Sequence, residues 1–276
     1  MHDEGDHSGY PGRLLIIGGA EDRCRGAGLL ERFVALCGGD LARIVLVTTA
    51  TGRPDQVHAD YDQAFRSLGA DRTTELRLRG RSDADGEDAA KLLEDATGVF
   101  FSGGDQSRLR TLVGSRANEI LRDRLGASDG LVIAGTSAGA TAMGRTMILG
   151  GEGPDVSAAA VRTGPGLGLI PKVLIDMHFG ERGRLPRLLS AVALDPDQLG
   201  VGIDEKTGIL VEGSCFEVLG NGVTTVVDAK HATVVHAAGD GDPITLFGVR
   251  LHLLPAGCIF DIATREATIG PAHDRY

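Results

Sequence analysis

Tryptophan is absent from this chain of 276 residues, and aromatic residues make up only 4% of it. Long apolar runs are missing too, because none reaches the roughly 20 residues that a membrane-spanning helix needs. Cysteine is scarce, and its few positions include no C-x-x-C pair: Cys24, Cys37, Cys215 and Cys258. This spacing predicts reduced thiols in the core rather than a disulfide framework or a zinc site. We therefore expect neither a membrane partner nor a bound metal.

Positive charge is in deficit, with 28 Lys and Arg against 38 Asp and Glu and a formal net charge of -10. Such a surface repels phosphates, so we expect no nucleic-acid partner, whereas a cationic ligand would be attracted. Residues 1–12 are polar and acidic, without the basic and apolar segments of a secretory signal. They predict a disordered tail on a cytoplasmic protein.

From Leu14 onwards, short apolar runs alternate with amphipathic ones, which predicts βαβ units and a mostly parallel sheet with helices on both faces. Past Gly200 the pattern changes to short strand-like runs with turn signals such as Asn221-Gly222, which predict an antiparallel extension. Residues 13–276 are expected to form a single domain. Strands are predicted at 14–17, 44–47, 74–78, 99–101, 131–134, 173–175 and 199–203, and helices at 29–36, 56–68 (capped by Asp55), 89–93, 107–112 and 117–125.

Four unusual loops follow predicted strands. They are Gly18–Asp22, Ser102–Gln106, Gly135–Gly139 and Asp176–Phe179. In parallel sheets the chemistry collects just beyond the carboxyl ends of the strands, so these loops predict an active site on one rim. The glycines of the first two loops fit neither a G-x-G-x-x-G nor a Gly-Lys-Ser phosphate loop.

Gly135-Thr136-Ser137-Ala138-Gly139 comes between an apolar run and a stretch of small residues. A Gly-x-Ser-x-Gly turn between strand and helix suits a nucleophile, because glycines tolerate its strained backbone and leave room around the hydroxyl. The helix that follows would direct its first N–H groups towards an oxyanion. Ser137 is therefore the candidate nucleophile.

A serine nucleophile needs a base and a group that orients that base. Among eight histidines, His178 is the first choice, because it follows a strand and lies on the predicted rim. Asp204 and Glu205 end another apolar run, and the pleat of a strand directs adjacent side chains to opposite faces, so only one of them would reach the site. The residues themselves leave that choice open. The order of an α/β-hydrolase would instead require a later histidine, namely His231, His236 or His252.

Five segments in this order resemble the cyanophycinase family of serine peptidases, which is related to peptidase E. They are Ile17–Asp22, Phe100–Gln106, Gly135–Ala140, Asp176–Phe179 with the arginines after it, and Gly200–Thr207. The resemblance implies a three-layer, doubly wound sheet like that of class I glutamine amidotransferases. It implies a serine exopeptidase without cofactor or metal, acting as a homodimer. The implied substrate is cyanophycin, an arginine-bearing polyaspartate from which β-aspartyl-arginine dipeptides are released.

The resemblance also implies a role for each matching residue. Ser137 would be the nucleophile, His178 the base and Glu205 the residue that orients it. The oxyanion hole would use Ala138 and the Gly104-Asp105 turn. The residues at substrate-pocket positions are Gln106, Asp176, Arg182, Arg184 and Arg187.

Met177 departs from the family pattern, in which glutamine is common at this position. Methionine can only pack, whereas glutamine could hydrogen-bond a dipeptide. This difference favours one alternative, a related serine amidase, isopeptidase or aspartyl dipeptidase acting on another small peptide. The other alternative is a catalytically silent binding protein of the same fold.

Overall fold

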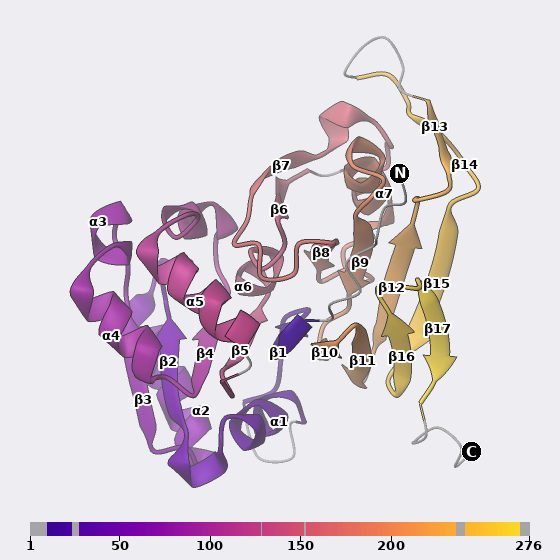
Figure 1. Ribbon diagram of the computed structural model, residues 1–276. Coiled ribbons are helices and arrows are strands. Elements are labelled where there is room, and N and C mark those ends of the chain that lie inside the picture. The colour runs from indigo at the N-terminus through magenta and orange to yellow at the C-terminus, as the bar shows by residue number, and fades with distance from the viewer. Residues whose placement is uncertain (1–9, 24–27, 128, 152, 236–240, 271–276) are drawn as a thin grey trace, which may run out of the picture.

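A nine-stranded sheet forms the centre of the computed structural model, which describes residues 10–23, 28–127, 129–151, 153–235 and 241–270 (Figure 1). One half is parallel, in the order β1 (Tyr10–Ile17), β5 (Val132–Thr136), β4 (Gly98–Phe101), β2 (Arg43–Val47) and β3 (Arg72–Leu76). The other half is antiparallel and continues from β1 through β10 (Thr207–Gly213), β11 (Cys215–Gly220), β16 (Cys258–Asp261) and β17 (Glu266–Ile269). The predicted α/β class with a C-terminal antiparallel extension is confirmed.

A second sheet of four strands was not predicted. Its order is β15 (Arg250–Pro255), β12 (Val223–Asp228), β9 (Leu199–Ile203) and β8 (Val173–Met177), with β8 and β9 parallel. The prediction that all four unusual loops follow strands of one sheet is therefore wrong for the histidine loop. An apolar run has the same period in either sheet, so the sequence does not specify which partner a strand chooses.

Strand β1 shows how the layers are built. Its side chains alternate between the two faces of the sheet: Leu14 and Ile16 enter one apolar core, and Leu15 and Ile17 enter another. Helices α1 (Leu29–Leu36) and α2 (Pro54–Ser67) complete the second core. Helices α4 (Glu87–Asp95) and α5 (Arg116–Ala127) complete the first together with the inner face of the second sheet. Helix α7 (Leu185–Leu194) covers the outer face of that sheet (Figure 1).

Two predicted helix details are corrected. Helix α2 begins at Pro54, whose missing N–H suits the first turn, and it has no side-chain cap; Asp55 instead pairs with Arg77 at 2.5 Å. The segment predicted as a helix at 107–112 is the 3-10 helix η2 (Gln106–Thr111), and the side chain of Asp105 accepts a hydrogen bond from the N–H of Ser107 at its start.

The short elements complete the chain. They are α3 (Arg81–Ala84), α6 (Ala138–Thr141), η1 (Gly39–Leu41), η3 (Ala158–Ala160), the pair β6 (Thr146–Gly150) and β7 (Arg162–Pro165), and the pair β13 (Thr233–Val235) and β14 (Thr245–Phe247). No helix in the described part of the chain is long and apolar enough to cross a membrane.

The predicted tail at residues 1–12 is corrected at its end, because residues 10–12 belong to β1; residues 1–9 lie outside the described part. Cys37, Cys215 and Cys258 are free thiols, and Cys24 lies outside the described residues. The largest apolar core contains residues of both sheets. This shared core supports one domain over 13–276, which stays a prediction.

Candidate active site

The turn between β5 and α6 holds Ser137 at its apex. Ser137 has a φ of 51°, a region that residues with a side chain rarely adopt. The flanking glycines are needed for close packing: a Cβ on Gly135 would lie 2.8 Å from the carbonyl carbon of Gly139, and one on Gly139 would lie 2.4 Å from the carbonyl oxygen of Phe101. This close packing holds the serine in its strained position. Helix α6 itself is a single turn, shorter than the motif suggests.

Two side chains from the second sheet meet this serine. His178 directly follows β8, and its Nε2 lies 3.0 Å from Ser137 Oγ. Glu205 comes two residues after β9, and its Oε1 lies 2.7 Å from His178 Nδ1. The three groups form a continuous hydrogen-bonded chain from hydroxyl to imidazole to carboxylate, the arrangement that activates a serine for attack.

Asp204 and Glu205 make hydrogen bonds with different groups. The two carboxylate oxygens of Asp204 accept the N–H groups of Gly180, at 2.8 Å, and Val223, at 3.1 Å. Asp204 therefore ties the histidine loop to β12, while Glu205 reaches the imidazole. Of the later histidines, His231 is exposed, His252 packs edge-on against Phe260, and His236 lies outside the described residues.

The Gly18-Gly19 loop after β1 joins the two sheets. The N–H of His178 donates to the carbonyl of Gly18 at 2.9 Å, and the N–H of Lys206 donates to that of Gly19 at 2.8 Å. A Cβ on Gly19, whose φ is +113°, would lie 2.3 Å from His178 Cε1. The glycines therefore leave room for the imidazole rather than for a phosphate.

The predicted oxyanion hole is corrected at one position. The N–H of Asp105 donates to the carbonyl of Ala50 at 2.9 Å, so it is not available to a ligand. The Asp105 carboxylate caps η2, and its hydrogen bonds with Ser107 lower its pKa below the usual value. Ala138 stands first in α6, where an N–H has no acceptor within the helix. Gly104 is in the same loop as Gly103, where a Cβ would lie 3.4 Å from Ser137 Cβ.

Among the predicted substrate residues, Asp176 and Arg187 are buried, and their side chains form an ion pair. Arg184 also lies near Asp176, at 3.5 Å, and donates to the carbonyl of Met177. Because Asp176 is fully buried, a direct contact between its carboxylate and a substrate is contradicted. The Asp176 carboxylate instead holds Arg184 and Arg187, which follow the loop that carries His178.

The exposure and the hydrogen bonds differ among the other three residues near the site, which are Arg182, Gln106 and Met177. Arg182 is exposed and makes no ion pair with any residue that the structure describes. The side-chain amide of Gln106 donates to the carbonyl of Ile148 at 2.8 Å. Met177 is buried, and the hydroxyl of Thr141 donates to its sulfur at 2.9 Å. Methionine at this position therefore packs into the core.

A pocket of about 400 Å³ contains Ser137 and His178 and is also lined by Glu21, Arg23 and Tyr61. The buried Glu21 carboxylate accepts hydrogen bonds from the Tyr61 hydroxyl and, at 2.5 Å, from the hydroxyl of Thr136, the residue before Ser137. Burial raises the pKa of Tyr61 well above its usual value and Glu21 adds to this, so the phenol stays a donor. Sequence reasoning missed these residues; the one signal was an acidic residue in the first glycine loop.

Among the described residues, no group of three or more His, Cys, Asp or Glu side chains is placed to hold a metal ion. The residues at the site offer hydroxyl, imidazole, carboxylate and backbone N–H groups. These suffice for acyl transfer through a serine.

Comparisons with known proteins agree with this chemistry. The model of peptidase family S51 matches residues 14–219. The chain is 39% identical to a cyanophycinase of Trichormus variabilis, over 95% of this chain and 89% of that one. It is 38% identical to a cyanophycinase of Synechococcus elongatus, over 94% and 82%.

Solved structures share the fold. A peptidase from an acI-B1 Actinobacterium superposes with a TM-score of 0.67 at 23% identity, over 92% of this chain and 98% of that one. A putative peptidase E protein from Listeria monocytogenes superposes with a TM-score of 0.50 at 14% identity, over 76% and 98%. The fold, the serine site and the relatives agree, and the chain belongs to peptidase family S51, together with the cyanophycinases.

Proposed function

We propose that this protein is a serine exopeptidase that cleaves cyanophycin and releases β-aspartyl-arginine dipeptides. The observation that carries the proposal is the hydrogen-bonded chain from Ser137 through His178 to Glu205. The identity of 36–39% to cyanophycinases over most of the chain supplies the substrate class.

The first half of the reaction is acylation. His178 Nε2 accepts the proton of Ser137 Oγ as this oxygen attacks the scissile carbonyl carbon, and Glu205 stabilises the imidazolium that forms. The N–H groups of Ala138 and Gly104 are the proposed donors to the oxyanion. Collapse of the tetrahedral intermediate breaks the C–N bond, and His178 returns the proton to the leaving amine.

The second half is hydrolysis. Water gives its proton to His178 and attacks the acyl carbon, and the Ser137 oxygen then leaves and regains a proton from the imidazole. The enzyme returns to its starting state, and one water is consumed for each dipeptide released.

We assign the recognition of a substrate carboxylate to Arg182, because its guanidinium is exposed and has no ion-pair partner among the described residues. Gln106 and Arg184 are the other proposed contact residues, and their side chains donate to the carbonyls of Ile148 and Met177. Asp176 and Arg187 are positioning residues, because their charges neutralise each other in the interior.

Met177 was the feature that favoured a different small-peptide substrate. Its burial removes that argument, since a side chain in the core does not distinguish substrates directly. The curated relatives that match over most of the chain carry the name cyanophycinase, which disfavours this alternative. The intact hydrogen-bonded site disfavours a silent binding protein.

Two further properties belong to the proposal. A homodimer is supported by Leu251 and Leu253, which are half or more exposed on the same face of β15, an edge strand of the second sheet. Light scattering on a Leu251→Ser/Leu253→Ser variant tests it, and an unchanged dimer mass would count against this face.

A cytoplasmic location is supported by the free thiols Cys37, Cys215 and Cys258, which suit a reducing compartment.

The decisive experiment incubates the purified protein with cyanophycin and with aspartyl dipeptides and identifies the products. We expect β-aspartyl-arginine from the polymer, and a Ser137→Ala variant that is folded but slower by about 10⁶-fold. A serine-directed phosphonate should label Ser137 in the wild type. Release of no dipeptide from the polymer would refute the substrate, and failure to label Ser137 would refute the mechanism.

A further inference from the structure

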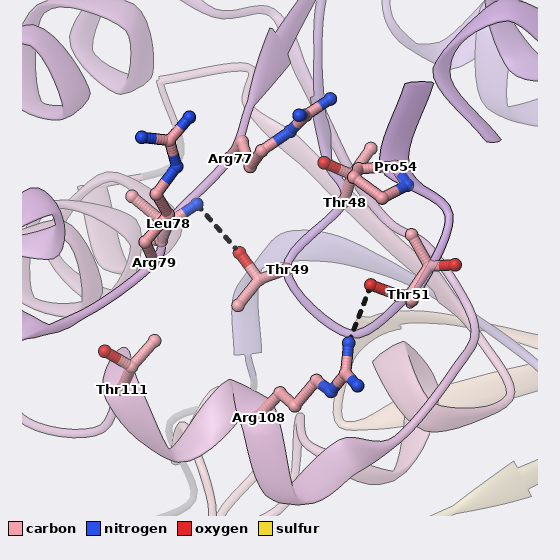
Figure 2. Close-up of a pocket in the computed structure, with 10 residues that line it drawn as sticks. Thr48, Thr49, Thr51, Pro54, Arg77, Leu78, Arg79, Arg108 and Thr111 are labelled. Atoms are coloured by element: carbon pink, nitrogen blue, oxygen red, sulfur yellow. Dashed lines mark hydrogen bonds between the residues drawn. The ribbon is translucent and has the colours of Figure 1, made fainter. Parts of the chain in front are cut away.

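A second hollow lies at the carboxyl ends of β2 and β3 (Figure 2). It has a volume of about 390 Å³, and its walls carry Arg77, Arg79 and Arg108 with several threonines. None of the described residues that line it is acidic. The pocket is therefore basic, although the chain as a whole has a net charge of -10.

The charges of the three arginines are not equally available. Arg77 pairs with Asp55 at 2.5 Å and with Glu75 at 3.1 Å, so its charge is compensated. Arg79 and Arg108 are exposed and form no ion pair with any described residue. Two positive charges therefore remain free to bind an anion.

The polar groups of the wall are arranged as donors. Arg108 Nη1 donates to the carbonyl of Thr51 at 2.9 Å, which fixes its guanidinium beside the pocket. The Thr49 hydroxyl oxygen accepts the N–H of Leu78 at 3.2 Å, which leaves its own hydrogen free to donate. Figure 2 shows Thr49 between Arg108 on one side and Arg77 and Arg79 on the other. These groups are all hydrogen-bond donors, which suits a carboxylate because it accepts hydrogen bonds through both oxygens.

The loop after β4 connects the serine site to this pocket. Gly103 packs against Ser137, while the next residues contact the turn after β2: Asp105 N–H donates to the carbonyl of Ala50, and a Cβ on Gly104 would lie 2.2 Å from the Ala50 carbonyl oxygen. Ser137 and Arg108 therefore lie on two sides of one short loop. Gly103 lines the pocket that contains Ser137, and Arg108, five positions later in the chain, lines the second pocket.

We propose that this pocket binds a carboxylate of the substrate polymer, on a residue beyond the dipeptide that is released. The proposal rests on the proposed function, because a β-linked arginine keeps its own α-carboxylate free at every repeat. The guanidinium of the same repeat has an acidic hollow next to it, which shares Arg77 and Leu78 with the pocket and is lined by Asp88 as well as by Asp83 and Glu87. Glu87 already pairs with Arg116, and Asp83 accepts the N–H of Arg79, so Asp88 is the main candidate partner. The pocket would hold a long substrate more tightly than a short one.

The test measures binding and turnover with substrates of two lengths, one of two β-aspartyl-arginine repeats and one of ten or more. An Arg79→Ala/Arg108→Ala variant is compared with Arg110→Ala, which removes an exposed arginine of the same η2 helix that does not line the pocket. We expect the double variant to raise KM for the long substrate about tenfold, with kcat and the two-repeat KM unchanged. Thermal unfolding confirms that the variants remain folded.

Two results would overturn the proposal. One is a long-substrate KM for the double variant within twofold of that for Arg110→Ala. The other is an equal rise in KM for both lengths, which would indicate a general disturbance of the site. If the wild type hydrolyses neither substrate, the proposed function fails, and the dissociation constant of the long substrate measured with Ser137→Ala proteins still decides whether the pocket binds it.

Discussion

The two sheets contribute to the site in different ways. The first sheet holds Ser137 locally, since the turn after β5 is fixed by its own glycines and by the neighbouring strand β4. The second sheet supplies His178 and Glu205, whose positions depend on contacts that cross to the first sheet at Gly18 and Gly19. The nucleophile is therefore a product of local geometry, and its activation is a product of how two sheets pack.

The largest effect that separates the two contributions is expected from Glu205→Gln. The amide cannot stabilise the imidazolium and favours the wrong imidazole tautomer, so kcat/KM should fall about 10⁴-fold while Ser137 keeps its turn. Steady-state kinetics on the dipeptide-releasing reaction measure this. The matched control is Asp204→Asn, which should mainly lower stability, because Asp204 accepts two N–H groups away from the imidazole. Equal losses of activity in both variants would contradict this division.

A smaller loss of activity is expected from Gly19→Ala, which tests the contact between the two sheets. The new methyl group displaces the imidazole, and a misplacement of about 1 Å costs about 10²-fold in rate. The control is Gly69→Ala, where φ is also left-handed, at +100°, but nothing lies within 4 Å of the new Cβ. Both variants should lose stability, and only Gly19→Ala should lose activity. A fully active Gly19→Ala enzyme would show that His178 tolerates the displacement.

A buried ion pair joins the sheets far from the site. Asp228 ends β12, and Arg265 lies in the turn before β17. Burial raises the pKa of Asp228, but the Lys230 N–H and the Arg265 guanidinium outweigh burial and hold it below the usual value. Asp228→Asn should lower the free energy of unfolding at pH 7 by about 3–5 kcal/mol, because it leaves Arg265 unpaired.

The pH dependence of that difference has a defined sign. A carboxyl whose pKa is lowered by folding stabilises the native state above its unfolded pKa, and this stabilisation is lost as the pH falls through the folded value. Urea unfolding should therefore show the gap between wild type and Asp228→Asn shrinking below about pH 4. Glu212→Gln, which breaks an exposed pair within the first sheet, should change stability by less than about 1 kcal/mol. A gap that widens in acid would contradict the assignment.

Among the variants near the serine site, the smallest effect on activity is expected from Met177→Leu. This swap conserves volume in the core between the sheets, so stability should change by less than about 1.5 kcal/mol. The values of kcat and KM for the polymer should stay within about twofold of wild type. A clear change in KM without a change in stability would show that residue 177 does contribute to substrate recognition.

The same comparison explains what the sequence could predict. Helix α1 has the bounds that its periodicity predicts, and Ser137 was found because a Gly-x-Ser-x-Gly turn is local. His178 was chosen because it follows a strand on the predicted rim. Glu205 was chosen over Asp204 by resemblance, because the pleat alone could not separate the two. The hydrogen-bond partners that distinguish the two carboxylates belong to other loops; for Asp204, one of them is the N–H of Gly180.

What the sequence missed depends on distant contacts. The second sheet was not predicted, because the strand at 173–177 is equally apolar in either sheet. Asp105 was assigned to the oxyanion hole, yet its N–H is taken by Ala50. No role was predicted for Glu21, although its carboxylate accepts hydrogen bonds from Tyr61 of α2 and from Thr136, the residue before Ser137. In each case the deciding neighbour is more than 20 residues away.

The position of β1 has a consequence for the order of assembly. This strand pairs with β5 on one side and with β10 on the other, and the Arg13–Glu212 pair closes a span of 199 residues. During synthesis, β1 and the serine turn can come together long before His178 and Glu205 leave the ribosome. Pairings of such long range form slowly. A growing chain thus carries its serine without a base, and the peptidase becomes active only when nearly all of it has been made.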